Sequence, residues 1–542
     1  MSPVLSIEGL SIALPEGAER PFALDTVSLT LASNEILCVV GESGSGKSMT
    51  ASAIMGLLPD GVRAEKGAIR FEGGDLLTLS QDELRAVRGA KIGMIFQEPM
   101  TALNPLKTIG DQIGEMFRTH TVFGRAEIAR RVEALLAEVH ISEPASAARA
   151  YPHELSGGQR QRAMIAMALA LEPGILIADE PTTALDVTTQ AQILKLIREL
   201  QQRKGTAVLF ITHDFGVVAE IADRVAVMRH GRVVEMGAAD EVLRRPRDAY
   251  TKALIAAIPP LTPPEPRPIS DETVLDITGL TKTYRSGGLF GRKRVTHAVR
   301  NVSLALPRGG TLGIVGESGS GKSTLARCIV RLLKPDAGAI RLGDADLATL
   351  SRSDMREQTR RVQMVFQDPY GSLNPRRRAG DLVAQGPMLH GATRKQAMDK
   401  ARELFSLVGL DPEAVDRFPH EFSGGQRQRI GLARALAMEP EVLVADEPVS
   451  ALDVSVQAQV LRVLADLRAK LGLSMVFITH DLRVAAQICD LIAVMRNGEV
   501  VEHGTANKIF GDPQHDYTRE LLASVPGRDW QQPMPAPTLA AL

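Results

Sequence analysis

The chain has 542 residues, of which 44% are hydrophobic and 23% are charged, and its formal net charge is −1 at pH 7. This length is too great for one ordinary core and predicts two or more domains. The balanced charge excludes a global basic field for nucleic acid but leaves local basic patches open. No apolar run approaches the roughly 20 residues that span a bilayer. The first residues, MSPVLSIEGL, lack the basic start of a secretory signal. We expect a cytoplasmic protein that reaches any membrane through partners.

The three cysteines, Cys38, Cys328 and Cys489, lie far apart along the chain. Their spacing offers no paired motif for zinc or an iron–sulfur cluster and argues against a disulfide framework. We expect free thiols, buried or half-buried, in a reducing compartment.

Five sequence blocks occur twice in the same order, which indicates an internal duplication. The blocks are GESGSGKS (Gly41–Ser48 and Gly316–Ser323), FQEPMTALNP or FQDPYGSLNP (Phe96–Pro105 and Phe366–Pro375), SGGQRQR (Ser156–Arg162 and Ser423–Arg429), ADEP (Ala178–Pro181 and Ala445–Pro448) and ITHD (Ile211–Asp214 and Ile478–Asp481). The offset is 275 residues for the first block and 267 for the last three. A period of this size means that each copy is a whole domain.

A proline-rich stretch separates the copies. Ile258–Thr273 contains six prolines, and such a segment stays extended and semi-rigid because it can join neither a helix nor a central strand. We predict a first domain over residues 1–257, a linker over 258–273, a second domain over 274–527 and a tail over 528–542. Each domain ends in a related segment, DAYTKALIAAIPP in the first and HDYTRELLASVPG in the second.

Each copy predicts a mixed α/β domain. Short apolar runs that end in glycine, acid or histidine are typical of central parallel strands with polar residues at their carboxyl ends. They are EILCVVGES, ILIADE and AVLFITHD in the first copy, and TLGIVGES, EVLVADE and SMVFITHD in the second. Charged amphipathic stretches over about 104–162 and 374–429 predict a helical insertion. Alternation around His230-Gly231 and Asn497-Gly498 predicts β-hairpins.

The GESGSGKS blocks fit the phosphate-loop pattern GxxxxGK[ST]. Glycines let backbone N–H groups converge on the β- and γ-phosphates, and the next helix directs its positive end there. A packing turn is the alternative, but two matches between a strand pattern and a helix pattern favour phosphate. We expect the lysines to neutralise phosphate charge and the serines that follow them to bind Mg²⁺. The predicted nucleotide-binding residues are Gly41, Ser43, Gly44, Gly46, Lys47, Ser48 and Met49 in the first copy, and Gly316, Ser318, Gly319, Gly321, Lys322, Ser323 and Thr324 in the second.

Two acids end an apolar run in each copy, at Asp179-Glu180 and Asp446-Glu447. We predict that Asp179 and Asp446 bind Mg²⁺ through water and that Glu180 and Glu447 are catalytic residues that polarise the attacking water. The alternative is an acidic strand end that faces solvent.

A histidine follows another apolar run in each copy, at His213 and His480. A single histidine is more often structural, but the repeated Thr-His-Asp favours contact between the imidazole and the γ-phosphate. We therefore count both histidines as catalytic.

The two copies resemble the ATP-binding cassette (ABC) family over nearly the whole chain. The family's diagnostic element, LSGGQ, stands at Leu155–Gln159 and, as FSGGQ, at Phe422–Gln426. The resemblance implies two tandem P-loop NTPase domains that use ATP and Mg²⁺, each with a RecA-like core, an antiparallel β subdomain and a helical subdomain. It also implies that this element, at a helix N-terminus, binds the γ-phosphate of a nucleotide held by the other cassette. Its residues here are Ser156, Gly157, Gly158 and Gln159, and Ser423, Gly424, Gly425 and Gln426.

Other family elements also occur twice. Gln97 and Gln367 match the Q-loop, which contacts nucleotide, Mg²⁺ or water and reports to the membrane domain, and ALD at 184–186 and 451–453 matches the D-loop. The family mechanism implies a head-to-tail pair of cassettes that encloses two ATPs. Because neither copy lacks its glutamate or histidine, we predict two hydrolytic sites. The predicted metal ligands are Ser48, Gln97, Asp179, Ser323, Gln367 and Asp446.

The two copies differ at one predicted nucleotide contact. Tyr284, in GLTKTYRSG, stands where the family stacks an aromatic ring on adenine, whereas Leu14 takes that place in GLSIALPEG. An ordinary strand aromatic is the alternative for Tyr284. If the ring does stack, the first site binds nucleotide more weakly because it lacks a flat π-face.

Three parts of each copy resemble the oligopeptide, dipeptide and nickel importer subfamily. They are the sequence around the Q-loop glutamine, the block YPHELSGGQRQR or FPHEFSGGQRQR, and the C-terminal end of the copy. A fused pair of this length is similar to peptide-import ATPases of the microcin C type, with the glutathione-import type as a close relative. The implied partners are two membrane permease subunits and an extracytoplasmic solute-binding protein, with no nucleic acid. The implied place is the cytoplasmic face of the inner membrane. No cysteine follows Cys489, so we expect no C-terminal iron–sulfur cluster.

Two other classes of twin-cassette protein are alternatives to a transporter. A ribosome-acting translation factor would carry a long, charged helical linker, and a DNA-repair cassette would carry zinc cysteines and large insertions. The sequence has neither feature, so we favour the ATPase motor of a peptide importer. Nickel, glutathione, opines and peptide-like antibiotics stay open as cargo.

Overall fold

The computed structural model describes residues 3–18, 20–183, 185–286, 294–450 and 452–530. Ala184 and Ala451, the first residues of the two predicted D-loops, and residues 531–542 of the predicted tail lie outside the described residues. The chain divides into two compact units. The first is formed mainly by Met1–Leu185 and Thr189–Ala256, and the second mainly by Ala257–Val525.

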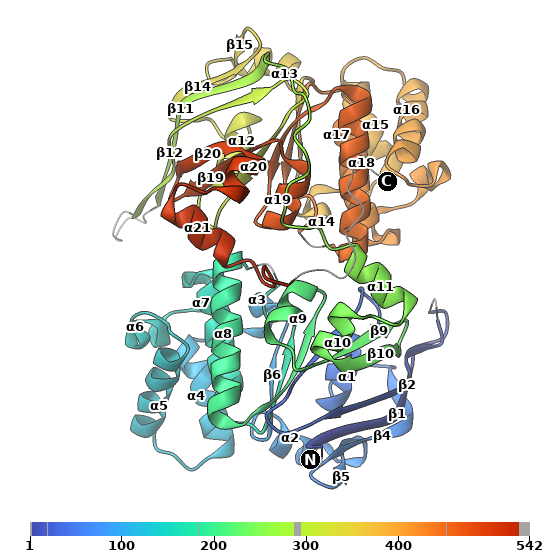
Figure 1. Ribbon diagram of the computed structural model, residues 1–542, viewed down its shortest axis with the longest axis vertical. Coiled ribbons are helices and arrows are strands. Elements are labelled where there is room, and N and C mark those ends of the chain that lie inside the picture. Colours follow the sequence, from blue (N-terminus) through green and yellow to red (C-terminus); the bar gives the residue numbers. More distant parts are fainter. Residues whose placement is uncertain (1–2, 19, 184, 287–293, 451, 531–542) are drawn as a thin grey trace. The chain divides into compact units, whose positions relative to one another are not determined.

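The core of the first unit is a six-stranded sheet in the order β10-β9-β3-β8-β7-β6 (Figure 1). All neighbouring strands are parallel except β9 and β10, which form an antiparallel pair at one edge. β3, β7 and β8 are buried along their whole length, as expected for a parallel sheet covered on both faces. The strands are Ile36–Val40 (β3), Ile92–Ile95 (β6), Ile175–Asp179 (β7), Ala207–Thr212 (β8), Arg224–Arg229 (β9) and Arg232–Ala238 (β10).

A second, antiparallel sheet of the first unit has the order β2-β1-β4-β5. Apolar side chains of β1 and β2 pack with α1 and with one face of the core sheet in a single buried cluster. This packing holds the start of α1 between the two sheets. The strands are Leu5–Ala13 (β1), Phe22–Leu31 (β2), Arg63–Phe71 (β4) and Gly74–Asp75 (β5).

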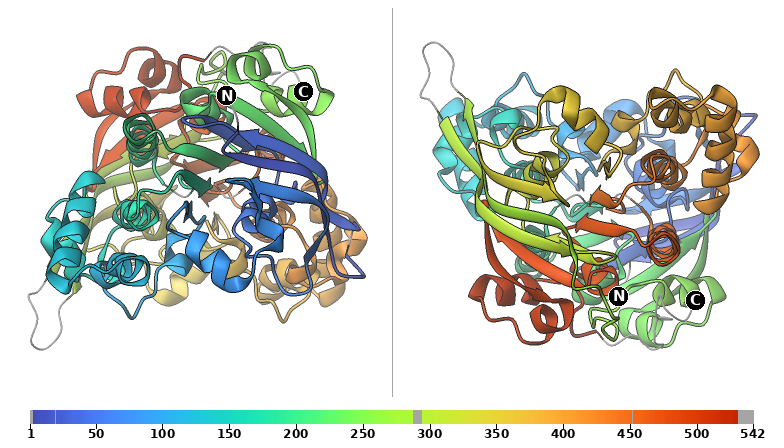
Figure 2. Two further views of the ribbon diagram at one scale, coloured as in Figure 1. Left: turned by 90° about the horizontal axis from the view of Figure 1, so that it is seen from below. Right: turned by 90° about the horizontal axis from the view of Figure 1, so that it is seen from above.

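The predicted helical insertion of the first unit is confirmed. α4, α5 and α6 contact one another, and α4 and α5 also contact α7. The three helices lie across the core sheet from β1, β2 and β4 (Figures 1 and 2). The helices are α1 (Lys47–Ile54), α2 (Gln81–Val87), α3 (Pro99–Ala102), α4 (Ile109–His120), α5 (Arg125–Glu138), α6 (Pro144–Arg149), α7 (Gly157–Leu169), α8 (Val187–Lys204), α9 (Phe215–Ile221), α10 (Ala239–Arg244) and α11 (Ala249–Ala256), with 3-10 turns η1 (Leu76–Thr78) and η2 (Pro152–Glu154).

The second unit repeats this topology, with a core sheet β16-β17-β18-β13-β19-β20 and an antiparallel sheet β12-β11-β14-β15. Its strands are β11 (Thr273–Ser286), β12 (Arg294–Pro307), β13 (Thr311–Val315), β14 (Ala337–Leu342), β15 (Ala345–Asp346), β16 (Val362–Val365), β17 (Val442–Asp446), β18 (Ser474–Ile478), β19 (Leu491–Arg496) and β20 (Glu499–Thr505). Its helices are α12 (Lys322–Ile329), α13 (Arg352–Gln358), α14 (Pro369–Ser372), α15 (Ala379–Leu389), α16 (Arg394–Leu407), α17 (Gly424–Leu436), α18 (Val454–Leu471), α19 (Leu482–Ile488), α20 (Ala506–Gly511) and α21 (Asp516–Ala523), with 3-10 turns η3 (Pro412–Asp416) and η4 (Pro419–Glu421).

Both predicted hairpins are present, as β9–β10 and β19–β20. The two residues between the strands have positive φ angles, 49° and 82° at His230 and Gly231, and 51° and 87° at Asn497 and Gly498. Positive φ at both positions is typical of the type I′ turn, whose twist matches that of the paired strands.

The proline-rich stretch belongs to the second unit and contains no helix or strand over residues 258–272. Gln487 Nε2, on α19, donates hydrogen bonds to the carbonyl oxygens of Pro260 (2.9 Å) and Thr262 (2.8 Å). Arg267 pairs with Asp490 through Nε (2.9 Å) and Nη2 (2.6 Å). The stretch is therefore attached to the surface of the second unit along its length.

No helix in the described part of the chain combines the length and the apolar character that crossing a bilayer requires.

Candidate functional site

The first phosphate loop connects β3 to α1. Gly41 has a φ of 153°, and a Cβ atom there would lie 2.2 Å from the carbonyl oxygen of Met228, so only glycine fits. Lys47 begins α1, and its Nζ donates hydrogen bonds to the carbonyl oxygens of Gly41 (2.7 Å) and Glu42 (2.9 Å). The lysine is folded back over the loop, where its charge can meet a phosphate.

The second loop, between β13 and α12, has the same geometry. Lys322 Nζ donates to the carbonyl oxygens of Gly316 (2.7 Å) and Glu317 (2.8 Å), and burial lowers the pKa of this lysine. Gly46 and Gly321 occupy the N-cap positions of α1 and α12, where no side chain caps the helix. The first-turn amides of each helix thus lack a side-chain acceptor, and a phosphate oxygen suits that place.

A serine faces an aspartate beside each loop. Ser48 Oγ donates to Asp179 Oδ1 over 3.0 Å, and Ser323 Oγ donates to Asp446 Oδ1 over 3.1 Å. Burial raises the pKa of Asp179 to about 6 and also raises that of Asp446. These hard oxygen atoms fit Mg²⁺, whose charge would favour the ionised carboxylates.

The protein offers few ligands for a Mg²⁺ ion at this place. The described residues contain no group of three or more His, Cys, Asp or Glu side chains suited to a metal ion. A Mg²⁺ ion at the serine–aspartate pair would therefore take most of its ligands from phosphate and water, as is usual for this ion.

Glu180 directly follows β7 and lies among three polar side chains. Its carboxylate accepts hydrogen bonds from Gln97 Nε2 (2.9 Å) and Thr183 Oγ1 (3.0 Å), and His213 Nδ1 lies 3.3 Å from its Oε1. Burial opposes ionisation, but the hydrogen bonds from His213 and Thr183 and the charges of His213 and Lys47 together outweigh it and hold the pKa of Glu180 at about 2. The carboxylate is thus ionised at neutral pH and can orient water or accept a proton.

Glu447 repeats this arrangement in the second unit. Gln367 Nε2 donates to Glu447 Oε2 over 2.8 Å, and His480 Nδ1 lies 3.2 Å from the same oxygen. Burial opposes both charges, yet the pair lowers the pKa of Glu447 and raises the pKa of His480. The structure therefore brings each predicted glutamate and histidine together. The contact of each imidazole with a γ-phosphate stays a prediction.

The backbone at both glutamates is in the left-handed region, with φ of 46° at Glu180 and 47° at Glu447. This conformation costs a residue with a side chain about 1–2 kcal/mol. The amides donate to the carbonyl oxygens of Ile211 and Ile478, each over 2.9 Å, and so extend the pairing of the core sheet by one residue. Such strain is concentrated at functional sites in proteins.

Both units match one known protein family. The model of the ABC transporter family matches residues 24–183 and 299–450, one segment in each unit. The chain belongs to the ABC transporter family. The predicted resemblance and the predicted fold class, two tandem P-loop cassettes, are confirmed, and the protein is an ATPase of this family.

Curated relatives match almost the whole of this ABC protein. A peptidoglycan transport ATP-binding protein of Agrobacterium fabrum is 48% identical and covers 96% of each chain. A glutathione import ATP-binding protein of Escherichia coli O157:H7 is 46% identical and covers 96% of this chain and 89% of its own. A model of the oligopeptide/dipeptide transporter C-terminal region also matches residues 234–283 and 501–538. A solved dimeric ATP-binding cassette with ADP and Pi is 30% identical, with a TM-score of 0.40, and covers 43% of this chain and 98% of its own.

In the second ABC cassette nine of the predicted residues line one cavity of about 700 Å³, whereas Gly316, Asp446, His480 and the signature residues are not part of its wall. Tyr284 stands at one part of its wall, and the phosphate-loop residues and Glu447 at another. Thr324 lines the cavity, whereas Met49, its counterpart in the first cassette, packs against the apolar cluster. The predicted residues in the wall are Tyr284, Ser318, Gly319, Gly321, Lys322, Ser323, Thr324, Gln367 and Glu447.

Sequence reasoning missed part of this wall. The segment from Val295 to Arg300 on β12 and the hairpin residue Asn497 also line the cavity. Asn497 was predicted only as a turn residue, and nothing in the local sequence of β12 marks a ligand contact. The pairing of β11 with β12 brings this segment beside Tyr284.

The difference between Leu14 and Tyr284 corresponds to one structural position. Ala13 pairs with Phe22 in the first ABC cassette, and Thr283 pairs with His297 in the second. The residue after each, Leu14 or Tyr284, therefore occupies the same register. Leu14 is partly buried against the apolar cluster, whereas Tyr284 is 39% exposed at the cavity.

The signature residues lie where α7 and α17 begin. Ser156 caps α7 in a capping box with Gln159, and Ser423 caps α17 in the same way with Gln426. Both helices start with the paired glycines Gly157-Gly158 and Gly424-Gly425. Contact of these residues with nucleotide stays a prediction.

Proposed function

We propose that this protein is the ATPase motor of an importer for peptides or peptide-like solutes, acting with two membrane permease subunits and an extracytoplasmic solute-binding protein. The supporting observation is the match of both C-terminal segments to the oligopeptide/dipeptide transporter region. The relatives' names support the same cargo class, because peptidoglycan and glutathione both contain peptide bonds. The proposed location is the cytoplasmic face of the membrane, reached through the permeases.

We propose one ATP in each phosphate loop, with Mg²⁺ held by Ser48 and Asp179 in the first cassette and by Ser323 and Asp446 in the second. The cation would neutralise the charge that develops on the phosphates. Glu180 and Glu447 orient the attacking water, and Gln97 and Gln367 hold these carboxylates in place. In the proposed head-to-tail pairing, the signature residues of each cassette complete the site of the other.

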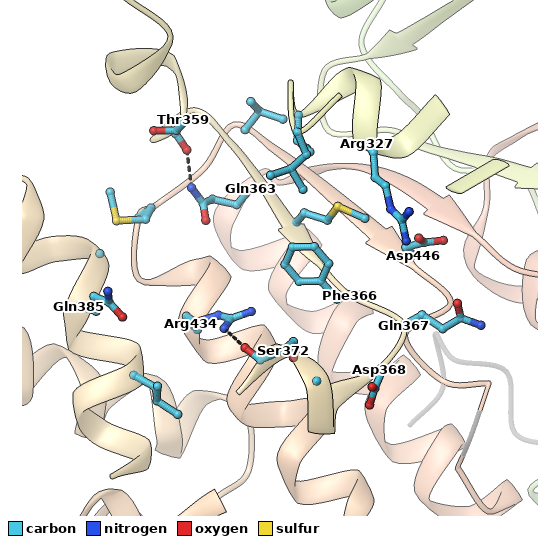
Figure 3. A pocket seen from close by; sticks show the side chains of 18 of the residues that line it. Arg327, Thr359, Gln363, Phe366, Gln367, Asp368, Ser372, Gln385, Arg434 and Asp446 are labelled. Atoms are coloured by element: carbon cyan, nitrogen blue, oxygen red, sulfur yellow. Dashed lines mark hydrogen bonds between the residues drawn. The ribbon is translucent and has the colours of Figure 1, made fainter. Parts of the chain in front are cut away.

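A groove in the second cassette is the proposed docking site for a permease. It has a volume of about 720 Å³ and lies between the core, at Phe366 and Arg327, and the helical subdomain, at Gln385 and Arg434 (Figure 3). Arg434 Nη1 donates to the carbonyl oxygen of Ser372 over 2.6 Å and so ties α17 to the segment after β16.

Gln367 connects this groove to the nucleotide cavity. It lines both the groove and the cavity, and its side-chain amide donates a hydrogen bond to Glu447. A permease segment that enters the groove would displace the Q-loop and with it the carboxylate that orients water. Movement of the membrane subunit and hydrolysis would then be coupled through one side chain.

A trap followed by purification tests the proposal. The double variant Glu180→Gln, Glu447→Gln is purified with ATP from gently solubilised native cells, beside wild-type protein. Recovery of two integral-membrane subunits supports the importer, and uptake of labelled peptides, glutathione and nickel then identifies the cargo. Recovery of ribosomes without membrane protein would overturn the transport proposal in favour of a translation factor.

A matched pair of surface variants tests the groove. Leu389 lines the groove and is 61% exposed, whereas Leu471, at the end of α18, is 56% exposed outside it. We expect Leu389→Arg to lose the co-purifying membrane subunits and keep its basal ATPase rate. Leu471→Arg should keep both, and equal losses in the two variants would contradict docking in the groove.

A further inference from the structure

The C-terminal segment of each unit contacts the phosphate loop of that unit through a tyrosine. In the first unit this extension, α10 and α11, places Tyr250 beside Glu42, the second residue of the loop. The amide of Glu42 donates to the Tyr250 hydroxyl over 3.2 Å, and that hydroxyl donates to Glu42 Oε2 over 3.1 Å. The residues involved are separated by 208 positions in the sequence.

The second unit repeats the contact in its own extension, α20 and α21. The amide of Glu317 donates to the Tyr517 hydroxyl over 3.2 Å. Tyr517 is 1% exposed and is among the largest fully buried side chains of the described residues. A contact present in both copies indicates a requirement of the loop.

Each tyrosine has a cation–π partner, and the turn before its helix is fixed by hydrogen bonds. The guanidinium of Arg229 lies 4.8 Å from the centre of the Tyr250 ring, and that of Arg496 lies 4.6 Å from the Tyr517 ring, a cation–π arrangement. Glu235 on β10 accepts hydrogen bonds from the amides of Arg247 (2.8 Å) and Asp248 (3.1 Å), which fixes the turn before α11.

The same turn is fixed in the second unit. Glu502 on β20 accepts from the amides of Gln514 (2.7 Å) and His515 (3.1 Å). Burial raises the pKa of both tyrosines to about 12, so each hydroxyl keeps its proton at neutral pH.

The tyrosine and the loop lysine share one residue of the loop. Lys47 donates to the carbonyl oxygen of Glu42, while Tyr250 accepts from the Glu42 amide. In the second unit Lys322 and Tyr517 engage Glu317 in the same way. The orientation of this residue therefore sets both the path of the loop and the resting position of the lysine.

We propose that Tyr250 and Tyr517 are positioning residues through which each C-terminal extension preorganises the adjacent phosphate loop for ATP. Removing a hydroxyl would leave a loop amide without its acceptor, and the loop would relax away from the conformation that receives phosphate. The inference depends on the nucleotide sites of the proposed function and adds a determinant of their affinity.

The test isolates one site at a time in the full-length protein. Tyr250→Phe is made in a Lys322→Ala background and Tyr517→Phe in a Lys47→Ala background, and the Kd of a fluorescent ATP analogue is measured with Mg²⁺. We expect each Tyr→Phe change to raise the Kd about three- to tenfold, the usual effect of one lost hydrogen bond. In the otherwise wild-type chain, KM for ATP should rise while kcat stays within about twofold.

Tyr151→Phe is the matched control. Tyr151 is 40% exposed, and its counterpart in the second unit is Phe418, so the change should leave the Kd unaltered. A Tyr250→Phe or Tyr517→Phe protein with a lower Tm and an unchanged Kd would overturn the inference, since the hydroxyl would then only support the fold. If the single-loop backgrounds bind no nucleotide before any tyrosine is changed, the proposed sites fail and the inference fails with them.

Discussion

The amide of Gln97 donates a hydrogen bond to the carboxylate of Glu180 over 2.9 Å. Gln367 and Glu447 repeat the contact at 2.8 Å in the second cassette. The glutamine begins the segment that leads to the helical subdomain, and the glutamate directly follows a strand of the core. Each nucleotide site is therefore connected to the subdomain that would meet a membrane partner.

Replacing the two glutamates should stop turnover without preventing ATP binding. We expect the double variant Glu180→Gln, Glu447→Gln to lose ATPase activity by about 100-fold or more, because the amide cannot accept a proton from water. Each single variant should lose a substantial part of the rate, since both sites retain the glutamate–histidine pair. Phosphate release measures the rate. If one single variant kept the wild-type turnover rate and the other were inactive, the prediction of two hydrolytic sites would be refuted.

The aromatic ring of Tyr284 should strengthen binding at the second site. In a Lys47→Ala background we expect Tyr284→Ala to raise the Kd of a fluorescent ATP analogue about 5- to 100-fold, the range for a lost base–aromatic stack. Tyr284→Phe keeps the ring and should stay within about twofold of the parent. Leu14→Tyr in a Lys322→Ala background should tighten the first site. Equal affinities of the two unmodified sites would contradict the predicted asymmetry.

The three thiols should be inert in the native protein. Cys38 and Cys328 are fully buried and Cys489 is 6% exposed, and burial raises the pKa of all three, that of Cys328 to about 11. Because the thiolate is the reactive form, an aromatic disulfide reagent at pH 8 should label none of them until the protein is unfolded. Ala126→Cys, at an exposed position of α5, serves as the control that reacts at once. Rapid labelling of the native wild-type chain would contradict the burial of these thiols.

Detaching the proline-rich stretch should weaken the second unit. Arg267→Ala removes the paired hydrogen bonds to Asp490 and should cost about 1–3 kcal/mol, the usual value for bonds between charged groups. Protease cleavage within residues 258–272 should become faster, and urea unfolding gives the free energy. Arg85→Ala breaks an exposed ion pair with Asp82 and should change stability by less than about 1 kcal/mol. An Arg267→Ala protein with the stability and cleavage rate of this control would show that the stretch is free.

The sequence predicted those parts of the fold that depend on local pattern. The runs that became β7 and β17 end in the expected acids, and the hairpins at His230-Gly231 and Asn497-Gly498 follow from residues that tolerate positive φ. The contact of Tyr250 with Glu42 could not be predicted, because its partners lie 208 residues apart and neither residue type indicates the pairing. Thr296 and His297 were missed for a related reason. Only the register of β11 against β12 brings them to the cavity, and register is decided by packing of the whole sheet.

The left-handed backbone of Glu180 and Glu447 places a steric penalty on a residue that the proposed reaction needs. Glycine adopts φ near 46° without the steric penalty that a Cβ atom brings. Glu180→Gly and Glu447→Gly proteins would thus lose backbone strain together with the carboxylate that the reaction needs. Each replacement would also remove the acceptor of the hydrogen bond from Gln97 or Gln367. Glutamate at both positions therefore carries a local backbone penalty, while its carboxylate supplies these contacts and the group that the proposed reaction needs.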